Sequence, residues 1–340
     1  MLGNRWFGIV VVMVGLMFAS SPTESAPVEI KMSASTAGGG ASYVTEALGN
    51  MWTKHVKKPY KVKVMVEPIV SMTESFKRLD SKDIDIAWQV SAFAYHMKKG
   101  TRMYKKMGAR TFYSLFWGGN SFLHIVTLDQ KIKSIKDMKG KRISGKRPGS
   151  PTLNQLRKAV FKAAGLTDKD ITLLSHTEMV DVCRQVKERV ADVGISITNY
   201  PTAPFTELAT AKKTYWISLP DKEIASAIKM QPYRMKHVMP AGVYPGQDHD
   251  VIGLRGVNGW FTRTDFDEEL AYQMIKAVFD NVGEFHAYHA AAKTYILQDA
   301  ASEMRIWPLH PGSVRYLKEK GLWSGELEAQ QKKLLQEAGL

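Results

Sequence analysis

The first third of the chain after residue 27 alternates short apolar runs with segments whose apolar side chains recur at helical spacing. Strands are expected at residues 28–35, 61–67 and 84–90, with helices at 42–57 and 71–79 between them, the second opened by a capping box at residues 71–74. A strand followed by a helix and a second strand is typical of an α/β unit with parallel strands. This segment therefore predicts one small α/β sheet covered by helices.

The same order of elements recurs about 110 residues later. Strands are expected at residues 141–144, 171–174 and 192–196, with helices at 153–164 and 178–189. The repeat predicts an α/β protein with two similar lobes, mostly parallel sheets and a cleft between the lobes. Ligands of such sheets bind outside the carboxyl ends of the strands.

Two further strand candidates, residues 122–128 and 258–262, flank the second half. They are expected to act as hinge strands that cross between the lobes. Lobe I is predicted to contain residues 27–121 and 259–340, and lobe II residues 122–258, including hinge strands.

The amino terminus has the order of segments found in a secretory signal peptide. Residues 1–5 carry one positive charge, residues 6–19 are uncharged and largely apolar, and residues 20–26 are small or polar. A run of about 14 apolar residues is short for a spanning helix, which needs about 17 to 25. We expect residues 1–26 to be a signal peptide that is removed on export to the periplasm.

The composition is that of a globular protein, with 340 residues, 44% of them hydrophobic, and a formal net charge of +14. The positive charge indicates an anionic partner, which could be nucleic acid, a membrane surface or a small acid. Export disfavours nucleic acid. The single cysteine, Cys183, has no disulfide partner and is expected to pack as a small apolar residue on a helix.

Two loops could bind a small anion. Residues 33–43 place three glycines between a strand and a helix, where backbone N–H groups can approach an anion, although a tight turn explains them as well. In the second loop, Ser150 and Pro151 have the order of a helix start. Here Arg147, Ser150 and Thr152 could instead offer a guanidinium and two hydroxyls to a carboxylate.

Other chemical motifs are incomplete. Residues 140–146 match the spacing of a phosphate-binding P-loop, but Arg147 occupies the place of the required Ser or Thr. His286 and His289 lack the HExxH pattern of a zinc enzyme, and Ser150 is not in a GxSxG motif. We expect no metal, no cofactor and no catalysis.

The chain resembles the TAXI family of solute-binding proteins, which serve TRAP transporters. The resemblance rests on the Gly-rich loop, on the PGS-x-T turn at residues 148–152 and on HPGSVRYLKEKG at residues 310–321, and it extends from about residue 28 to 321. Pro151 stands where the family usually has glycine. The resemblance implies two lobes that close over a small organic acid, commonly a dicarboxylate or a glutamate-like compound, for delivery to a membrane permease.

The resemblance also implies which residues contact the solute. They are Ser35, Thr36, Gly39, Tyr43 and Gln89 in the first lobe and Ser150, Thr152, Thr198 and Asn199 in the second. Arg147 is expected to supply the positive charge. The predicted function is thus that of a monomeric periplasmic binding protein that captures an anionic solute and partners with TRAP-type permease subunits.

Three alternatives remain open at this point. A sensing module of the same fold would deliver its ligand to a receptor rather than to a permease. An exported hydrolase would use Ser150 as its nucleophile, and a nucleic-acid binder would use the overall positive charge.

Overall fold

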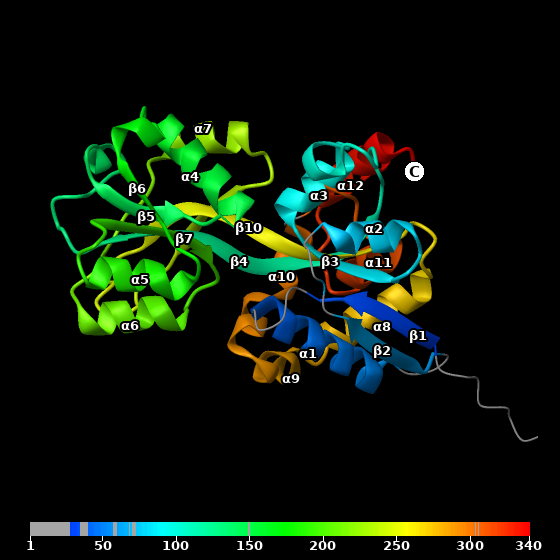
Figure 1. Cartoon of the computed structure of the whole chain (residues 1–340). Coiled ribbons are helices and arrows are strands. Elements are labelled where there is room, and N and C mark those ends of the chain that lie inside the picture. Colours follow the sequence, from blue (N-terminus) through cyan, green and yellow to red (C-terminus); the bar gives the residue numbers. More distant parts are fainter. Residues whose placement is uncertain are drawn as a thin grey trace, which may run out of the picture.

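The computed structural model describes residues 28–34, 40–56, 60–67, 69, 73–148, 150–302, 304 and 306–340. Its elements form two bodies, which we call lobe I and lobe II, joined by the long strands β4 (Tyr113–Thr127) and β10 (Val251–Thr262) (Figure 1). The predicted signal peptide lies outside the described residues. No helix in the described part of the chain is both long and apolar enough to span a bilayer.

Lobe I contains both ends of the described chain. Its strands are β1 (Val28–Ser33), β2 (Val62–Glu67) and β3 (Ile86–Val90). Its helices are α1 (Gly40–His55), α2 (Glu74–Asp80), α3 (Ser91–Lys98), α8 (Glu268–Phe279), α9 (Val282–Tyr288), α10 (Leu297–Ser302), α11 (Pro311–Glu319) and α12 (Gly325–Ala338), with the short 3-10 helices η1 (Arg102–Tyr104) and η4 (Ala290–Thr294).

Lobe II consists of the middle of the chain. Its strands are β5 (Arg142–Lys146), β6 (Thr172–Ser175), β7 (Val193–Thr198), β8 (Tyr215–Trp216) and β9 (Met235–Met239). Its helices are α4 (Pro151–Ala163), α5 (Met179–Lys187), α6 (Ala203–Ala211) and α7 (Asp221–Met230), with η2 (Lys136–Met138) and η3 (Asp168–Asp170).

One continuous sheet runs through both lobes in the order β2-β1-β3-β10-β4-β7-β5-β6. The repeat predicted from the sequence is present, because β2-β1-β3 and β6-β5-β7 have the same internal order on opposite sides of the crossing strands. Strands within these two groups pair in parallel, whereas β4 and β10 pair with each other and with the other labelled strands in an antiparallel manner. The α/β class and the paired lobes are therefore as predicted.

The two crossing strands are longer than the predicted runs of residues 122–128 and 258–262. The first part of β4 and the last part of β10 pair with each other in lobe I, and β4 continues into lobe II beside β7. Gly118, Gly119, Gly253 and Gly256 interrupt the apolar pattern, so propensity alone began each predicted strand too late. The predicted lobe boundaries, at residues 121/122 and 258/259, both fall inside these strands.

Each lobe has its own apolar core. In lobe I, Trp52 and Trp260 are fully buried between the sheet and α1 and α8, and the indole N–H of Trp52 donates to Met274 O at 2.9 Å. In lobe II, helices α4 and α7 cover the sheet around Ile143 and Val193. Cys183 is buried, and burial raises the pKa of its thiol to about 12, as expected for a packing residue.

Candidate functional site

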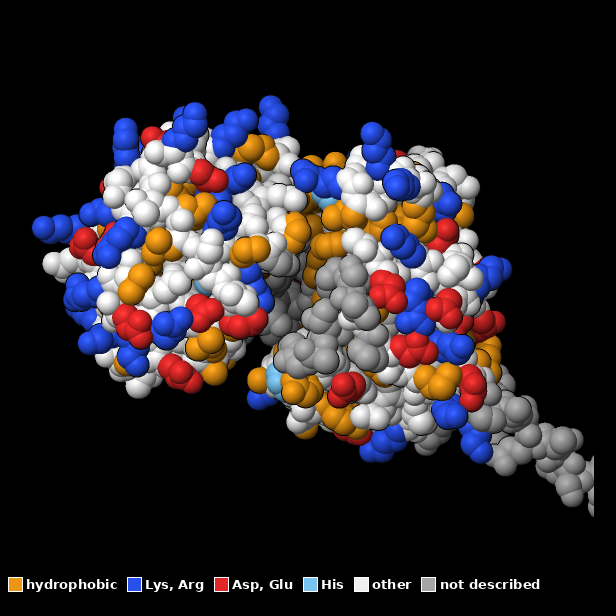
Figure 2. Space-filling view, viewed as in Figure 1, with side chains coloured by type: hydrophobic (Ala, Val, Ile, Leu, Met, Phe, Trp, Pro, Cys, Tyr) orange, Lys and Arg blue, Asp and Glu red, His pale blue; other side chains and the backbone are white. Residues whose placement is uncertain are grey.

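A small cavity of about 30 Å³ lies at the junction of the two lobes, where β4 and β10 cross. It is lined by Val90, Ser91 and Ala92 of lobe I, by Thr152 and Ile197 of lobe II, and by Ser121, Arg234, Gly256 and Val257 at the crossing. Because both lobes and both crossing strands contribute to it, the cavity changes whenever the lobes move relative to one another. Figure 2 shows a hollow between the two lobes.

Arg234 is the charged residue in the wall of this cavity. Its side chain is almost entirely buried, at 4% exposure, and the guanidinium has no ion pair with any residue that the structure describes. Its Nε has no hydrogen-bond partner there. Burial lowers the pKa of Arg234 to about 10, so the side chain is still protonated at neutral pH. A buried, charged group without a partner is costly unless an anion compensates it.

Gly256 makes the position of Arg234 possible. A Cβ atom at residue 256 would lie 2.5 Å from Nη1 of Arg234 and 3.4 Å from Oγ of Ser91. The β10 backbone also has a register irregularity between Gly256 and Asn258, which bends the strand at the crossing. The absence of a side chain therefore lets the guanidinium lie against the strand.

The rest of the cavity wall combines three hydroxyl side chains with four apolar side chains and the backbone of Gly256. The Ser91 hydroxyl donates to the carbonyl oxygen of Tyr233 at 3.1 Å, which joins the start of α3 to the segment that carries Arg234. The hydroxyls of Thr152 and Ser150 lie 3.5 Å apart at the start of α4. Hydroxyls beside a cation form a polar wall that can bind an oxyanion.

The predicted contacts fall in different places. Ser35, Thr36 and Gly39 lie outside the described residues. Thr152 lines the cavity, Gln89 precedes Val90 in the buried end of β3, and Thr198 and Asn199 follow Ile197 at the end of β7. Tyr43 is exposed on α1, where its ring stacks on His289 with a centroid distance of 4.9 Å.

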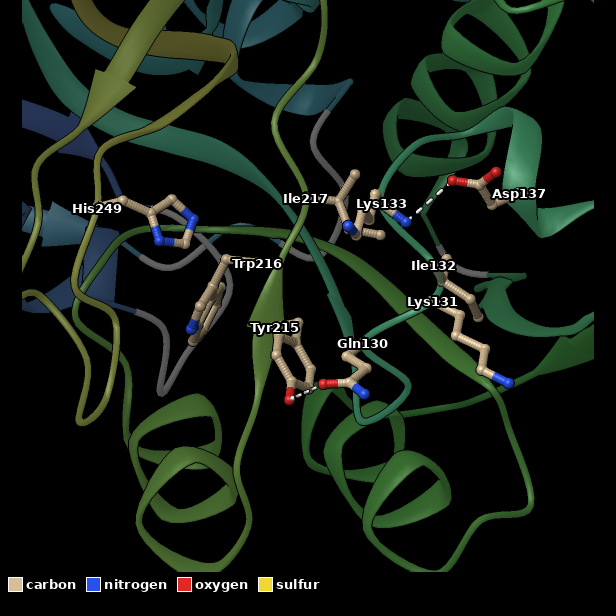
Figure 3. Close-up of a pocket in the computed structure, with 9 residues that line it drawn as sticks. All are labelled: Gln130, Lys131, Ile132, Lys133, Asp137, Tyr215, Trp216, Ile217 and His249. Carbon is tan, nitrogen blue, oxygen red and sulfur yellow. Dashed lines mark hydrogen bonds between the residues drawn. The ribbon is translucent and has the colours of Figure 1, made fainter.

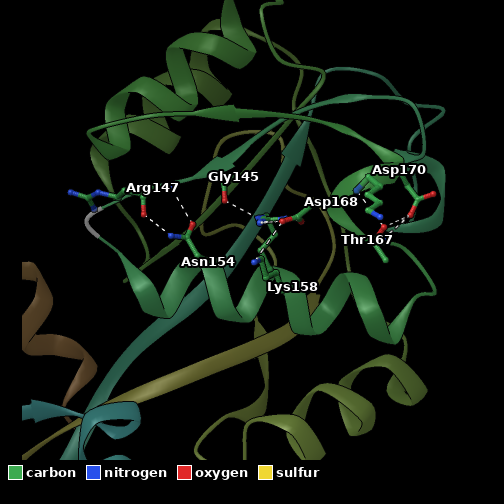
Figure 4. Close-up of polar contacts among 9 residues, drawn as sticks. Gly145, Arg147, Asn154, Lys158, Thr167, Asp168 and Asp170 are labelled. Carbon is green, nitrogen blue, oxygen red and sulfur yellow. Dashed lines mark hydrogen bonds and ion pairs between the residues drawn. The ribbon is translucent and has the colours of Figure 1, made fainter. Parts of the chain in front are cut away.

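Arg147 occupies the loop before α4, where Figure 4 shows its backbone bonded to the side chain of Asn154. Its own side chain is already engaged by other residues. Nε donates to Thr177 O at 2.8 Å, and Nη2 lies 3.4 Å from a carboxylate oxygen of Glu178. The side chain of Asn154 fixes the loop, since it accepts from Arg147 N at 3.1 Å and donates to Arg147 O at 2.7 Å. Arg147 remains a predicted contact of the solute.

A larger hollow of about 780 Å³ lies on the surface of lobe II (Figure 3). Its lining residues belong to residues 130–137, to residues 215–217 and to residue 249. In it, the hydroxyl of Tyr215 donates to Gln130 Oε1 at 3.4 Å and Lys133 N donates to Asp137 Oδ2 at 3.0 Å. Since lobe I contributes nothing to this hollow, lobe closure has no direct means of acting on it.

The described residues contain no group of three His, Cys, Asp or Glu side chains placed to hold a metal ion. His286 and His289, considered above as metal ligands, have structural partners. His286 Nε2 lies 3.0 Å from Tyr295 O, and His289 Nδ1 accepts from Ala291 N at the start of η4.

Sequence reasoning missed Arg234. It stands in the segment QPYRMKHV, which has no motif, and its significance arises from burial at the lobe junction. The available signal was a lone arginine at the start of an apolar strand pattern, where a charge is unusual.

The chain thus has two lobes with matching sheets, two strands that cross between them and a cavity at their junction. The chain belongs to the NMT1-like family, whose model matches residues 32–321.

Solved structures of binding proteins resemble this chain at low identity. The periplasmic aliphatic sulphonate binding protein SsuA from Escherichia coli is 12% identical, with a TM-score of 0.47 over 92% of this chain and 86% of that one. A TctC solute binding protein from Polaromonas is 13% identical, with a TM-score of 0.48 over 77% of this chain and 86% of that one. Substrate binding domain 2 of Lactococcus lactis GlnP is 15% identical, with a TM-score of 0.42 over 80% and 97%.

Proposed function

We propose that this protein is a periplasmic binding protein that captures a small organic anion between its lobes and releases it to a membrane permease. The unpaired, buried guanidinium of Arg234 in the junction cavity carries the proposal. An anionic group of the solute would compensate this charge, and the hydroxyl of Thr152 would add a neutral hydrogen bond.

Closure of the lobes would couple binding to delivery. A solute that contacts both walls of the cavity stabilises the closed arrangement of the lobes, and a partner can distinguish that arrangement from the open one. The crossing strands β4 and β10 are the connection about which the lobes would move. Binding and release are sufficient for this role, and the proposal contains no catalytic step.

The sequence motifs support a more specific proposal about the type of transporter and the solute. The Gly-rich loop, the PGS-x-T turn and residues 310–321 support a TAXI-type protein that serves a TRAP permease, with a dicarboxylate or glutamate-like solute. Residues 1–26 would direct export and be removed. The predicted contacts Gln89, Arg147, Ser150, Thr198 and Asn199 would surround the solute when the lobes close.

A thermal-shift and calorimetric screen of residues 27–340 tests the proposal. Succinate, L-glutamate and ethanesulfonate cover the carboxylate and sulfonate classes, and a bound acid raises the melting temperature by mass action. The substitution Arg234→Met removes the charge at similar volume. It is expected to weaken binding of the best acid by about 1.5 to 3 kcal/mol, which is about 10- to 150-fold.

The same variant carries an internal check on folding. Because Arg234 is buried without a partner, Arg234→Met is expected to raise the melting temperature of the solute-free protein while binding is lost. Arg147→Met is the comparison, with a smaller effect expected because that guanidinium is partly exposed and already bonded. Undiminished binding of the acid by Arg234→Met would show that the solute binds elsewhere.

A further inference from the structure

A second hollow between the lobes, of about 370 Å³, lies on the side of α3, α4 and α7. We call it the basic groove. Arg102 stands on its lobe I wall, and Lys158, Lys162 and Lys229 stand on its lobe II wall. No Asp or Glu is among the described residues that line it. Figure 2 shows Lys and Arg side chains on both sides of the hollow between the lobes.

The charges of the basic groove are poorly neutralised. Arg102, Lys162 and Lys229 make no ion pair with any described residue, and all are exposed. Lys158 Nζ lies 3.9 Å from Asp168, a carboxylate that also binds Arg157. Exposed cations on one face are ordinary, but cations on two facing walls add their potentials in the space between them.

The basic groove and the junction cavity are neighbours along the chain at Tyr233 and Arg234. Tyr233 lines the groove, and Arg234, the next residue, lines the cavity. The ring of Tyr233 lies 5.4 Å from that of Tyr95 and 5.8 Å from that of His96, across the junction of the lobes, and 5.6 Å from Cζ of Arg234. Burial raises the pKa of Tyr233, while the cations of Arg234 and Arg102 oppose that change, so both cations act on the same side chain.

The groove keeps its charge across the neutral pH range without help from histidine. Burial, and after it the neighbouring Arg102 cation, lower the pKa of His96 to about 4, so the imidazole is neutral. The positive potential therefore comes from the arginine and the lysines.

We propose that the basic groove is an entrance that concentrates anionic solutes beside the Arg234 cavity and accelerates their binding. This inference rests on the proposed function for the destination of the anion. Charges at the rim of a site act mainly on the association rate constant, and their effect falls as ionic strength rises.

The first test measures the potential of the groove without any solute. Amide-proton relaxation in the wild type is compared with 3-carboxy-PROXYL, 3-carbamoyl-PROXYL and 3-aminomethyl-PROXYL as anionic, neutral and cationic probes. At Tyr95, Gln155 and Lys229 the anionic probe is expected to enhance relaxation several-fold more than the cationic probe. Equal enhancements at these amides would overturn the proposal.

The second test removes the charges. The triple variant Lys158→Gln, Lys162→Gln, Lys229→Gln is compared with Lys139→Gln, Lys169→Gln, Lys187→Gln, which loses the same net charge from exposed positions outside the groove. The groove variant is expected to lose the difference between the anionic and cationic probes at the groove amides, and the control variant to retain it.

Kinetics with succinate separate this inference from the proposed function. At low ionic strength, stopped-flow tryptophan fluorescence is expected to show an association rate constant about 3- to 10-fold lower in the groove variant, with an unchanged dissociation rate constant. An unchanged association rate constant, with binding still abolished by Arg234→Met, would refute the entrance and leave the binding function standing. If the wild type binds none of the acids, the proposed function fails, and the entrance fails with it even when the probes report a positive groove.

Discussion

Burial changes the chemistry of single side chains at the centre of this protein. Arg234 keeps its charge in the junction cavity with no ion-pair partner among the described residues, whereas His124 is held neutral inside lobe II. His124 Nδ1 donates to the carbonyl oxygen of Phe122 at 3.1 Å, so Nε2 must accept, and the hydroxyl of Tyr244 donates to it at 3.0 Å. The ring also stacks on Phe205, 4.7 Å away.

The buried histidines predict that acid destabilises the protein before its carboxylates titrate. Burial lowers the pKa of His124 from 6.5 to about 4, so the unfolded chain binds a proton at a pH where the folded chain does not. The stabilisation is present above pH 6.5 and is lost as the pH falls toward 4, by up to about 1.4 kcal/mol per pH unit for one histidine. Urea unfolding between pH 7 and 4.5 measures it.

A double substitution isolates the contribution of His124 to the pH dependence of stability. The double variant His124→Phe, Tyr244→Phe removes both partners of the hydrogen bond between these side chains, so that neither is left buried without the other. Its free energy of unfolding is expected to fall less steeply with decreasing pH than that of the wild type. His96, His237 and His310, whose pKa values burial also lowers to about 4, contribute to the slope that remains. Parallel pH profiles in the two proteins would contradict the assignment.

At the scale of elements, the two crossing strands determine where a solute can bind. β4 and β10 pair with each other over most of their length and carry glycines at the crossing, among them Gly119 with φ +79° and Gly256. Glycine adopts a left-handed backbone conformation at little cost, and it has no Cβ atom. The strands thus link the lobes and also leave space for Arg234.

A methyl group at residue 256 is expected to impair binding without unfolding the protein. The Cβ of Gly256→Ala would meet the end of the flexible Arg234 side chain, which can move aside at small cost in stability. The guanidinium would then leave its place in the cavity, and affinity for the acid is expected to fall about 10-fold, the loss of one charge-assisted hydrogen bond. Calorimetry and thermal unfolding measure the two effects.

Gly283→Ala in α9 is the matched control, because a Cβ there meets no atom within 4 Å. It is expected to stabilise the helix by about 0.4 to 1 kcal/mol and to leave affinity unchanged. Equal affinity in Gly256→Ala and the wild type would show that the position of the guanidinium does not matter to the solute.

At the scale of the whole molecule, the arrangement of charge complements the arrangement of lobes. The net charge of +14 is spread over the surface, but unpaired cations face one another across the basic groove and one cation is buried at the junction. Facing cations repel, so they favour separated lobes until an anion reduces the repulsion. Solute binding and lobe closure are therefore expected to be coupled.

Small-angle X-ray scattering measures this coupling. The radius of gyration of the wild type is expected to decrease when the acid identified by the thermal screen reaches saturation. Arg234→Met is expected to show no change at the same concentration. To shift the lobes from 1:99 to 99:1 closed, the acid must bind the closed form about 10⁴-fold more tightly than the open form. An unchanged radius of gyration in the saturated wild type would refute closure by a rigid-body movement.

Local pattern was sufficient for much of the fold. The strands at 28–35, 61–67 and 84–90 and their repeat at 141–196 were predictable because alternation and helical spacing are properties of neighbouring residues. The structure reproduces these elements with ends shifted by a few residues, as β1, β2, β3, β5, β6 and β7. The crossing strands were predicted too short, since their glycine-containing parts are held by pairing with distant residues.

The sequence by itself determined the α/β class, the duplicated half and the position of the loop before α4, because each depends on a local pattern. Tertiary structure alone decided that Arg234 is buried without a partner, that Arg147 is bonded to Thr177 and Glu178, and that Arg102 faces the lysines of α4. These properties depend on which distant segments meet at the lobe junction. The environment of a charged side chain depends on the packing of the whole chain, and the residues next to it in the sequence do not determine it.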